Sequence, residues 1–225
     1  MGLRCRHMAM DECGSRTNLL GQLRPEVQER LDVELLRVGD GLALMPALLQ
    51  VKRKGVRVRM ILPLEHDPGF PERLWDLEPF LAEGIDVRWG PTVRDRRLVA
   101  DGRRAYRLDG EWIKLDPKLG SRPLASTDGT VHISSGEVLD KQERRARFDR
   151  LDRILCVRIW ALGGRFPLYF SSERTPVDAL SPGDRIKVLF VIIWGGSGLF
   201  SAFAPSELYY EGVGFRWIRS ENRPP

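Results

Sequence analysis

The sequence predicts an α/β fold in which a mixed-sheet α/β unit is followed by a small all-β barrel or sandwich. Between residues 32 and 89, short β-prone runs alternate with longer runs of helical period, as in strands connected by helices. Beyond residue 154, five short β-prone runs are separated by Gly and Pro turns, which is typical of a small barrel or sandwich. A chain of 225 residues with 42% apolar residues can fill such a core.

Three segments follow from this change in pattern. Residues 1–23 show no sustained period and are expected to form a loosely ordered N-terminal arm. Residues 24–153 form the predicted α/β domain, and residues 154–225 form the β-rich C-terminal module.

The α/β domain is predicted to alternate helices and strands. In order, these are a helix over 24–31, a strand over 32–38, a helix over 40–55, a strand over 56–63, a helix over 71–84 and a strand over 85–89. Pro25 is expected in the first turn of the first helix. Asp40 is expected to cap the second helix and Gly55 to end it, with Pro46 straining or shortening it.

Two Asp-Gly dipeptides, at 101–102 and 109–110, lie between short β runs and predict antiparallel hairpins. The first lies in "VRDRRLVADGRRAY", where Leu98 and Ala100 are expected to point inward while the arginines face water. Residues 117–130 predict a loop. Residues 137–154 predict a helix with a solvated arginine face.

The C-terminal module is predicted from its β-prone runs. These cover residues 155–162, 165–172, 185–194, 199–204 and 209–218, with a turn at 181–185. Trp160, Trp194 and Trp217 lie in three of these runs. They are either core aromatics, which is the commoner situation, or a stacking surface for a ligand.

The chain is basic, with a net charge of +5 and a pI near 9.4. This charge permits a polyanionic partner without requiring one. Arginine outnumbers lysine by 30 to 6, and the planar guanidinium suits phosphate groups better than an ammonium does. A GC-rich genome or a hot habitat would produce the same bias.

Three cysteines form too sparse a set for a disulfide scaffold, which favours a reducing, cytoplasmic location. Cys5, His7 and Cys13 lie close together, but no later Cys/His pair completes a zinc site, so no metal and no other cofactor is expected. The N-terminus has no continuous apolar core of a signal peptide. Residues 188–204 are uncharged and could span a membrane, but their central Gly-Gly-Ser-Gly favours a β-hairpin.

The order of elements over residues 30–153 resembles one half of the phospholipase D superfamily. The carrying motifs are "KRKGVRVRMILP", "LAEGIDVRW" and the hairpin "RDRRLVADGRR", followed by "ERRARFDRLDRI" in the place of the family's closing helix. On the family's HxKxxxxD motif, Arg94 takes the place of the histidine, Arg96 that of the lysine, and Asp101 matches the aspartate. An arginine cannot act as the nucleophile, so the resemblance implies a degenerate, single-repeat, non-catalytic member.

The resemblance extends to the effector domain of TrmB-type transcriptional regulators, which also carry a β-rich module. Residues 1–23 are too short for their winged helix, so any DNA-binding part is expected in another chain. The first hypothesis is binding of a phosphate-bearing ligand or nucleic acid through Arg94, Arg96, Arg97 and Asp101. The alternatives are a small-molecule, sugar-like sensor in transcription regulation and a residual phosphodiesterase. A homodimer is expected because the chain resembles half of a two-repeat core.

Overall fold

Eleven strands form one mixed sheet in the part of the chain that the computed structural model describes, with few helices beside it. The described residues are 27–63, 72–90, 92–109, 112–145, 151–171, 177–194 and 208–218. The strand order is β10-β11-β9-β8-β7-β3-β2-β1-β4-β5-β6, and β10 also pairs with β7. The α/β class predicted from the sequence is therefore confirmed.

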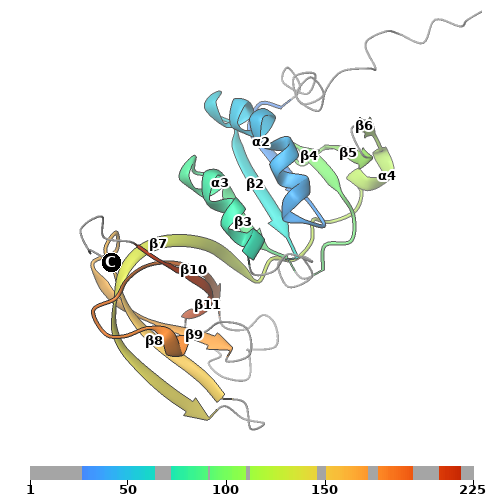
Figure 1. Cartoon of the computed structure of the whole chain (residues 1–225). Helices are drawn as coiled ribbons and strands as arrows, with labels where there is room; N and C mark the ends of the chain where they lie inside the picture. Colours follow the sequence, from blue (N-terminus) through green and yellow to red (C-terminus); the bar gives the residue numbers. More distant parts are fainter. Residues whose placement is uncertain are drawn as a thin grey trace, which may run out of the picture.

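Three parallel strands form the centre of the α/β part. They are β1 (Arg30–Glu34), β2 (Arg57–Leu62) and β3 (Asp86–Trp89), joined by α2 (Val38–Arg53), η3 (Glu72–Leu77) and α3 (Glu78–Ala82). Leu31 and Val33 are buried in the core that α2 covers, and Asp32 and Glu34 point to the opposite face. Figure 1 shows α2 and α3 on the same side of β2 and β3.

Three antiparallel strands extend the sheet beyond β1. These are β4 (Arg97–Ala100), β5 (Arg104–Asp109) and β6 (Trp112–Leu115), with the short helix α4 (Pro117–Gly120) beside β5. Asp101 and Gly102 have φ angles of +50° and +67°, as a type I′ turn requires, so the first predicted hairpin is confirmed. β5 and β6 also pair as predicted, and Gly110 of the second turn lies outside the described residues.

Five strands in the C-terminal half pair in a closed circuit. These are β7 (Gly129–Arg145), β8 (Leu151–Ile159), β9 (Gly164–Ser171), β10 (Arg185–Trp194) and β11 (Leu208–Trp217), with η4 (Val177–Ala179) before β10. The pairs β7–β8, β8–β9 and β10–β11 are antiparallel, β9–β11 is parallel, and β10–β7 closes the circuit.

Strands β7 and β10 belong to both halves of the molecule. Val131 of β7 and Val191 of β10 are buried in the core that contains α2 and α3, whereas Ile186 and Phe190 of β10 are buried inside the five-strand circuit. In Figure 1, β7 runs from the α/β part into the circuit. The predicted division into 24–153 and 154–225 stays a prediction, and the circuit already begins at Gly129.

The helix predicted over residues 137–154 is wrong. Residues 137–145 continue β7, and residues 151–154 begin β8. The charged run favours a helix by propensity, but β7 is paired with β8 on one side and β10 on the other, and such tertiary pairing overrides a weak propensity. Gly136 permits the close approach of β8, because a Cβ at position 136 would lie 2.5 Å from the carbonyl oxygen of Arg158. The resemblance to the phospholipase D superfamily thus loses its closing helix.

Two further helix predictions need correction. The helix over 24–31 is wrong where it is described, because residues 27–29 are irregular and Arg30 begins β1. The second helix starts at Val38, so Arg37 and not Asp40 occupies the N-cap position. Asp40 lies in the first turn, where the helix dipole favours a carboxylate. Pro46 stays inside a 16-residue helix, and Gly55 follows its end with φ +86° as predicted.

Among the remaining elements, three predictions hold only in part. The strand predicted over 32–38 ends at Glu34, and the helix predicted over 71–84 is a 3₁₀ helix, η3, followed by the short α3. The loop predicted over 117–130 contains α4 and the first residues of β7.

The strands predicted over 56–63 and 85–89 are confirmed as β2 and β3, and four of the five C-terminal β runs are confirmed as β8 to β11. The fifth run, 199–204, lies outside the described residues. Within the apolar stretch 188–204, residues 188–194 belong to β10. No helix in the described ranges is long and apolar enough to cross a membrane.

Candidate functional site

Asp101, the one residue that matches the superfamily motif, acts as a structural acceptor at the hairpin turn. Its Oδ1 accepts hydrogen bonds from the backbone N–H groups of Glu29 and Arg30, at 2.9 and 2.8 Å, and its Oδ2 accepts one from Gln28 at 3.0 Å. Burial raises the pKa of Asp101, but these three donors and the nearby Arg103 outweigh it and lower the pKa overall. Asp101 therefore fixes the chain that enters β1.

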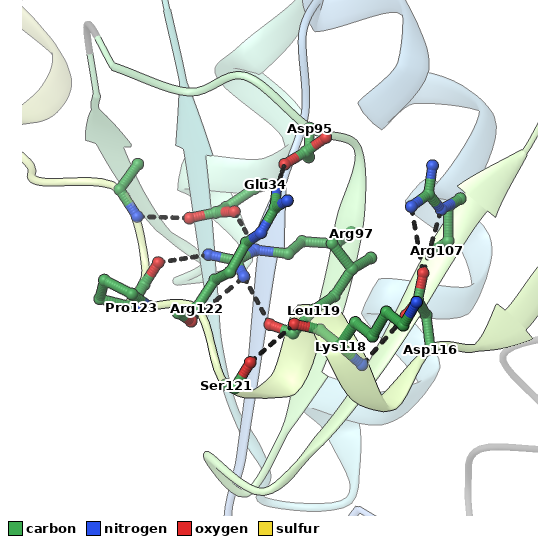
Figure 2. A network of polar contacts seen from close by, with 11 residues as sticks. Glu34, Asp95, Arg97, Arg107, Asp116, Lys118, Leu119, Ser121, Arg122 and Pro123 are labelled. Atoms are coloured by element: carbon green, nitrogen blue, oxygen red, sulfur yellow. Dashed lines mark hydrogen bonds and ion pairs between the residues drawn. The ribbon is translucent and has the colours of Figure 1, made fainter.

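Arg97 is buried, and its guanidinium donates hydrogen bonds to other groups of the protein. It pairs with the equally buried Glu34 and donates to the backbone carbonyls of Leu119 at 2.8 Å, Arg122 at 3.2 Å and Pro123 at 2.6 Å. Glu34 also accepts from the N–H of Ala125. Figure 2 shows Arg97 surrounded by Glu34, Leu119 and Pro123. These bonds hold the 119–125 segment against β1 and β4. Four of the five guanidinium N–H donors are used in these bonds and the side chain is only 4% exposed, so Arg97 cannot present paired donors to a phosphate group.

Arg94 and Arg96 lie in the segment just before β4, at the opposite end of this strand from Asp101. Arg94 is exposed, and Arg96 is partly exposed and lies 3.5 Å from Asp40 at the start of α2. Four strand residues separate Arg96 from Asp101, which corresponds to about 17 Å at roughly 3.3 Å per residue. The structure therefore does not bring the three motif positions into one cleft. Anion binding by Arg94 and Arg96 stays a prediction.

The tryptophans also differ from the commoner expectation. Trp160 and Trp217 are 42% and 50% exposed, so neither is a core residue. The guanidinium of Arg185 lies 4.8 Å from the ring centroid of Trp160, within cation–π range. Trp217 contacts Phe215 edge-on, with 5.1 Å between ring centroids. The side chain of Trp194 lies outside the described residues.

A row of charged side chains crosses the outer face of the five-strand circuit. In register, Arg185 of β10 lies opposite Glu137 of β7, Glu137 opposite Arg158 of β8, and Arg158 opposite Arg165 of β9. The residues that flank them in sequence, such as Val157 and Ile159, point into the core. We call these four residues the arginine row. At roughly 4.8 Å between strands, the row is about 14 Å long.

Among the residues that the structure describes, the arginine row has few partners. Arg158 is 53% exposed and pairs with Glu137 at 3.8 Å, a distance beyond a hydrogen bond. Arg165 is exposed and directly opposes Arg158, an arrangement of like charges that destabilises a sheet. Three cations therefore share one carboxylate within the row. Exposed positive charge therefore exceeds negative charge within the row.

A cavity of about 410 Å³ adjoins one end of the arginine row, and we call it the junction pocket. It lies between α3, which contributes Glu78 and Leu81, and β7, whose outer face contributes Ser135. Lys187 of β10 pairs with Glu78 across it. Trp160 and Ala161 line it from the turn after β8. Trp160 therefore belongs both to the pocket and, through Arg185, to the row.

Sequence reasoning missed the arginine row because it depends on strand register. The segment that contains Glu137 was expected to be helical, which concealed its pairing with β8. One signal was present, since Arg158 and Arg165 stand symmetrically on either side of the turn at residues 160–163. Two residues placed in this way on a tight hairpin must face the same side. No protein-family model and no curated protein sequence matches this chain.

Proposed function

We propose that this chain is a non-catalytic binding protein whose arginine row holds the phosphate groups of a single-stranded nucleic acid. The observation that carries the proposal is the row itself, which contains three exposed guanidinium groups and a single carboxylate. Arginine binds phosphate through paired N–H donors, and such contacts dominate nucleic-acid affinity. An anionic backbone on the row would also relieve the repulsion between Arg158 and Arg165.

The exposed aromatic side chain beside the row favours a single strand over a duplex. Bases of a single strand are free to stack on aromatic rings, whereas those of a duplex are already stacked. Trp160 is exposed and in contact with Arg185 of the row. The row and this ring together supply the two kinds of contact that single strands use.

The proposal includes a finer description of the fold. We propose that the five-strand circuit is a small barrel and that residues 30–109 form a degenerate phospholipase D-like unit, as the order β1-α2-β2-α3-β3 followed by the β4–β5 hairpin suggests. Five-stranded barrels of the OB type bind oligonucleotides over their second and third strands. In this chain those strands are β8 and β9, which carry Arg158 and Arg165. A role in transcription regulation and a homodimer belong to the same proposal.

The test is oligonucleotide binding by the double variant Arg158→Gln/Arg165→Gln. A fluorescent 12-nucleotide single strand, followed by fluorescence anisotropy, should bind the double variant at least tenfold more weakly than the wild type. The dependence of log K on log salt concentration should also become shallower by about 1.4, because each lost phosphate contact removes about 0.7.

The matched control is Arg53→Gln/Arg57→Gln, which removes the same charge from exposed positions on α2 and β2. This control should retain the wild-type affinity within about twofold. Equal losses in both double variants would mean that net charge alone attracts the oligonucleotide, and the arginine row would not be the site.

A further inference from the structure

The junction pocket has the composition of a site for a planar heterocycle. A volume of about 410 Å³ lies in the lower part of the range of small-molecule pockets, about 300–1,000 Å³. Its wall includes one exposed aromatic ring, that of Trp160, and two apolar side chains, Leu81 and Ile133. A flat ring can stack on such a wall while its edge reaches polar groups.

The polar groups of the junction pocket supply both donors and acceptors. Ser135 carries a hydroxyl group, Glu78 a carboxylate and Lys187 an ammonium group. The Glu78–Lys187 pair is itself 39% and 36% exposed, so its atoms remain accessible to a ligand. A nucleobase has donors and acceptors along one edge and two π faces, and it matches this set.

The junction pocket lies next to Arg185 of the arginine row, which could bind the phosphate group of a nucleotide. Arg185 and Lys187 are two residues apart on β10 and therefore point to the same outer face. Arg185 lies over Trp160, which lines the pocket. A base stacked on Trp160 would thus have a cation within reach of its own phosphate.

We propose that the junction pocket binds one nucleotide, whose base stacks on Trp160 and whose phosphate pairs with Arg185. The path of the remaining nucleic-acid strand along the arginine row rests on the proposed function. Binding in the pocket itself requires only a mononucleotide. A strand end is the natural source of such a nucleotide, since one terminal base can enter a pocket of this size while the following phosphates continue toward Arg158 and Arg165.

The test uses adenosine 5′-monophosphate and ribose 5-phosphate as probes of the full chain, followed by isothermal titration calorimetry. Adenosine 5′-monophosphate should bind at least tenfold more tightly than ribose 5-phosphate, because the sugar phosphate cannot stack. Trp160→Ala should weaken nucleotide binding at least tenfold. Trp217→Ala is the matched control, since it removes an equally exposed tryptophan that does not line the pocket, and it should leave binding within twofold.

A spectroscopic readout covers the case in which Trp160→Ala does not fold. Trp160→Phe keeps an aromatic wall, so it should bind adenosine 5′-monophosphate within about fivefold of the wild type. The quenching of tryptophan fluorescence by the bound base should be lost in this variant. Quenching that persists in Trp160→Phe, or absence of nucleotide binding to the wild type, would overturn the inference.

Oligonucleotide binding separates this inference from the proposed function. If the 12-nucleotide strand depends on Arg158 and Arg165 while adenosine 5′-monophosphate does not bind, the pocket inference fails and the proposed function stands. If adenosine 5′-monophosphate binds through Trp160 while the strand does not bind, the pocket stands and the proposed function fails.

Discussion

Arg97 and Arg158 show two opposite uses of the same side chain. Arg97 is 4% exposed and donates to one carboxylate and three backbone carbonyls. Arg158 is 53% exposed and has one carboxylate at 3.8 Å. An arginine-rich motif therefore does not by itself mark a binding site. The useful criterion is how many of the guanidinium donors the protein already uses, because only unused donors can recognise a ligand.

The largest loss of stability is expected when the buried guanidinium of Arg97 is removed. Arg97→Met keeps most of the side-chain volume but leaves Glu34 buried without its partner and three carbonyls without a donor. We expect a loss of about 3–5 kcal/mol in the free energy of unfolding, the usual cost of breaking a buried ion pair. Urea denaturation followed by circular dichroism measures it.

The control for Arg97→Met is the double variant Glu34→Gln/Arg97→Met. Since this variant removes both charges, it should be less destabilised than the sum of the two single variants. A loss below about 1 kcal/mol in Arg97→Met would show that Arg97 is not a structural residue. It would also return Arg97 to the set of candidate anion ligands.

The hairpin around Arg97 shows how far the sequence leads. The Asp-Gly dipeptide determines a type I′ turn, and the alternation of Leu98 and Ala100 determines the inward face, because both depend on neighbouring residues only. The burial of Arg97 depends on the segment around Leu119, more than twenty residues away. No local pattern contains that contact, so the hairpin was predictable and the role of its arginine was not.

Asp101 extends the comparison to the other end of β4. Asp101→Ala removes the acceptor of three backbone N–H groups and places a residue with a Cβ but no polar group at φ +50°. We expect a loss of about 2 kcal/mol, by analogy with helix N-caps and because alanine is disfavoured at positive φ. Thermal and urea denaturation measure this loss.

Asp101→Asn separates the charge from the conformation, because asparagine tolerates positive φ. It should lose less than Asp101→Ala. The pKa of Asp101 is lowered in the folded state, so its charge stabilises the fold above its ordinary pKa of 3.8 and ceases to do so as the pH falls through the folded value. The difference between the wild type and Asp101→Asn should therefore shrink below about pH 4. A difference that grows at acid pH would contradict this account.

The error over residues 137–154 marks the limit of propensity arguments. The run from Lys141 to Arg147 is rich in helix formers, and nothing in it opposes a helix. Two features determine the strand instead. Gly136 permits the close approach of β8, and β7 is paired with a strand on each side. The same error hides the arginine row, because the position of Glu137 between Arg185 and Arg158 follows from the pairing of β7 with β10 and β8.

His132 lies on β7, the strand shared by the two cores, and its protonation is expected to affect the stability of the fold. Its ring stacks on Phe190 at 5.5 Å, and burial, followed by the charge of Arg88, lowers its pKa from 6.5 although Asp86 acts in the opposite direction. The unfolded chain therefore takes up the proton first, so the fold should lose stability as the pH falls from 7 through 6.5 toward the folded pKa. His132→Phe should lose this pH dependence. Equal slopes of unfolding free energy against pH in both proteins would contradict it.

The smallest effect on stability is expected for substitutions in the arginine row, although these have the largest expected effect on nucleic-acid binding. Arg158→Gln/Arg165→Gln removes two exposed cations that oppose each other across β8 and β9, so the free energy of unfolding should change by less than about 0.5 kcal/mol or rise slightly. A rise should be larger at low salt, because the relieved repulsion is screened at high salt. Denaturation at two salt concentrations measures both effects. A loss of 2 kcal/mol or more in the free energy of unfolding would show that the fold requires Arg158 and Arg165, as it requires Arg97. The proposal that they bind an anionic partner would then lose its support.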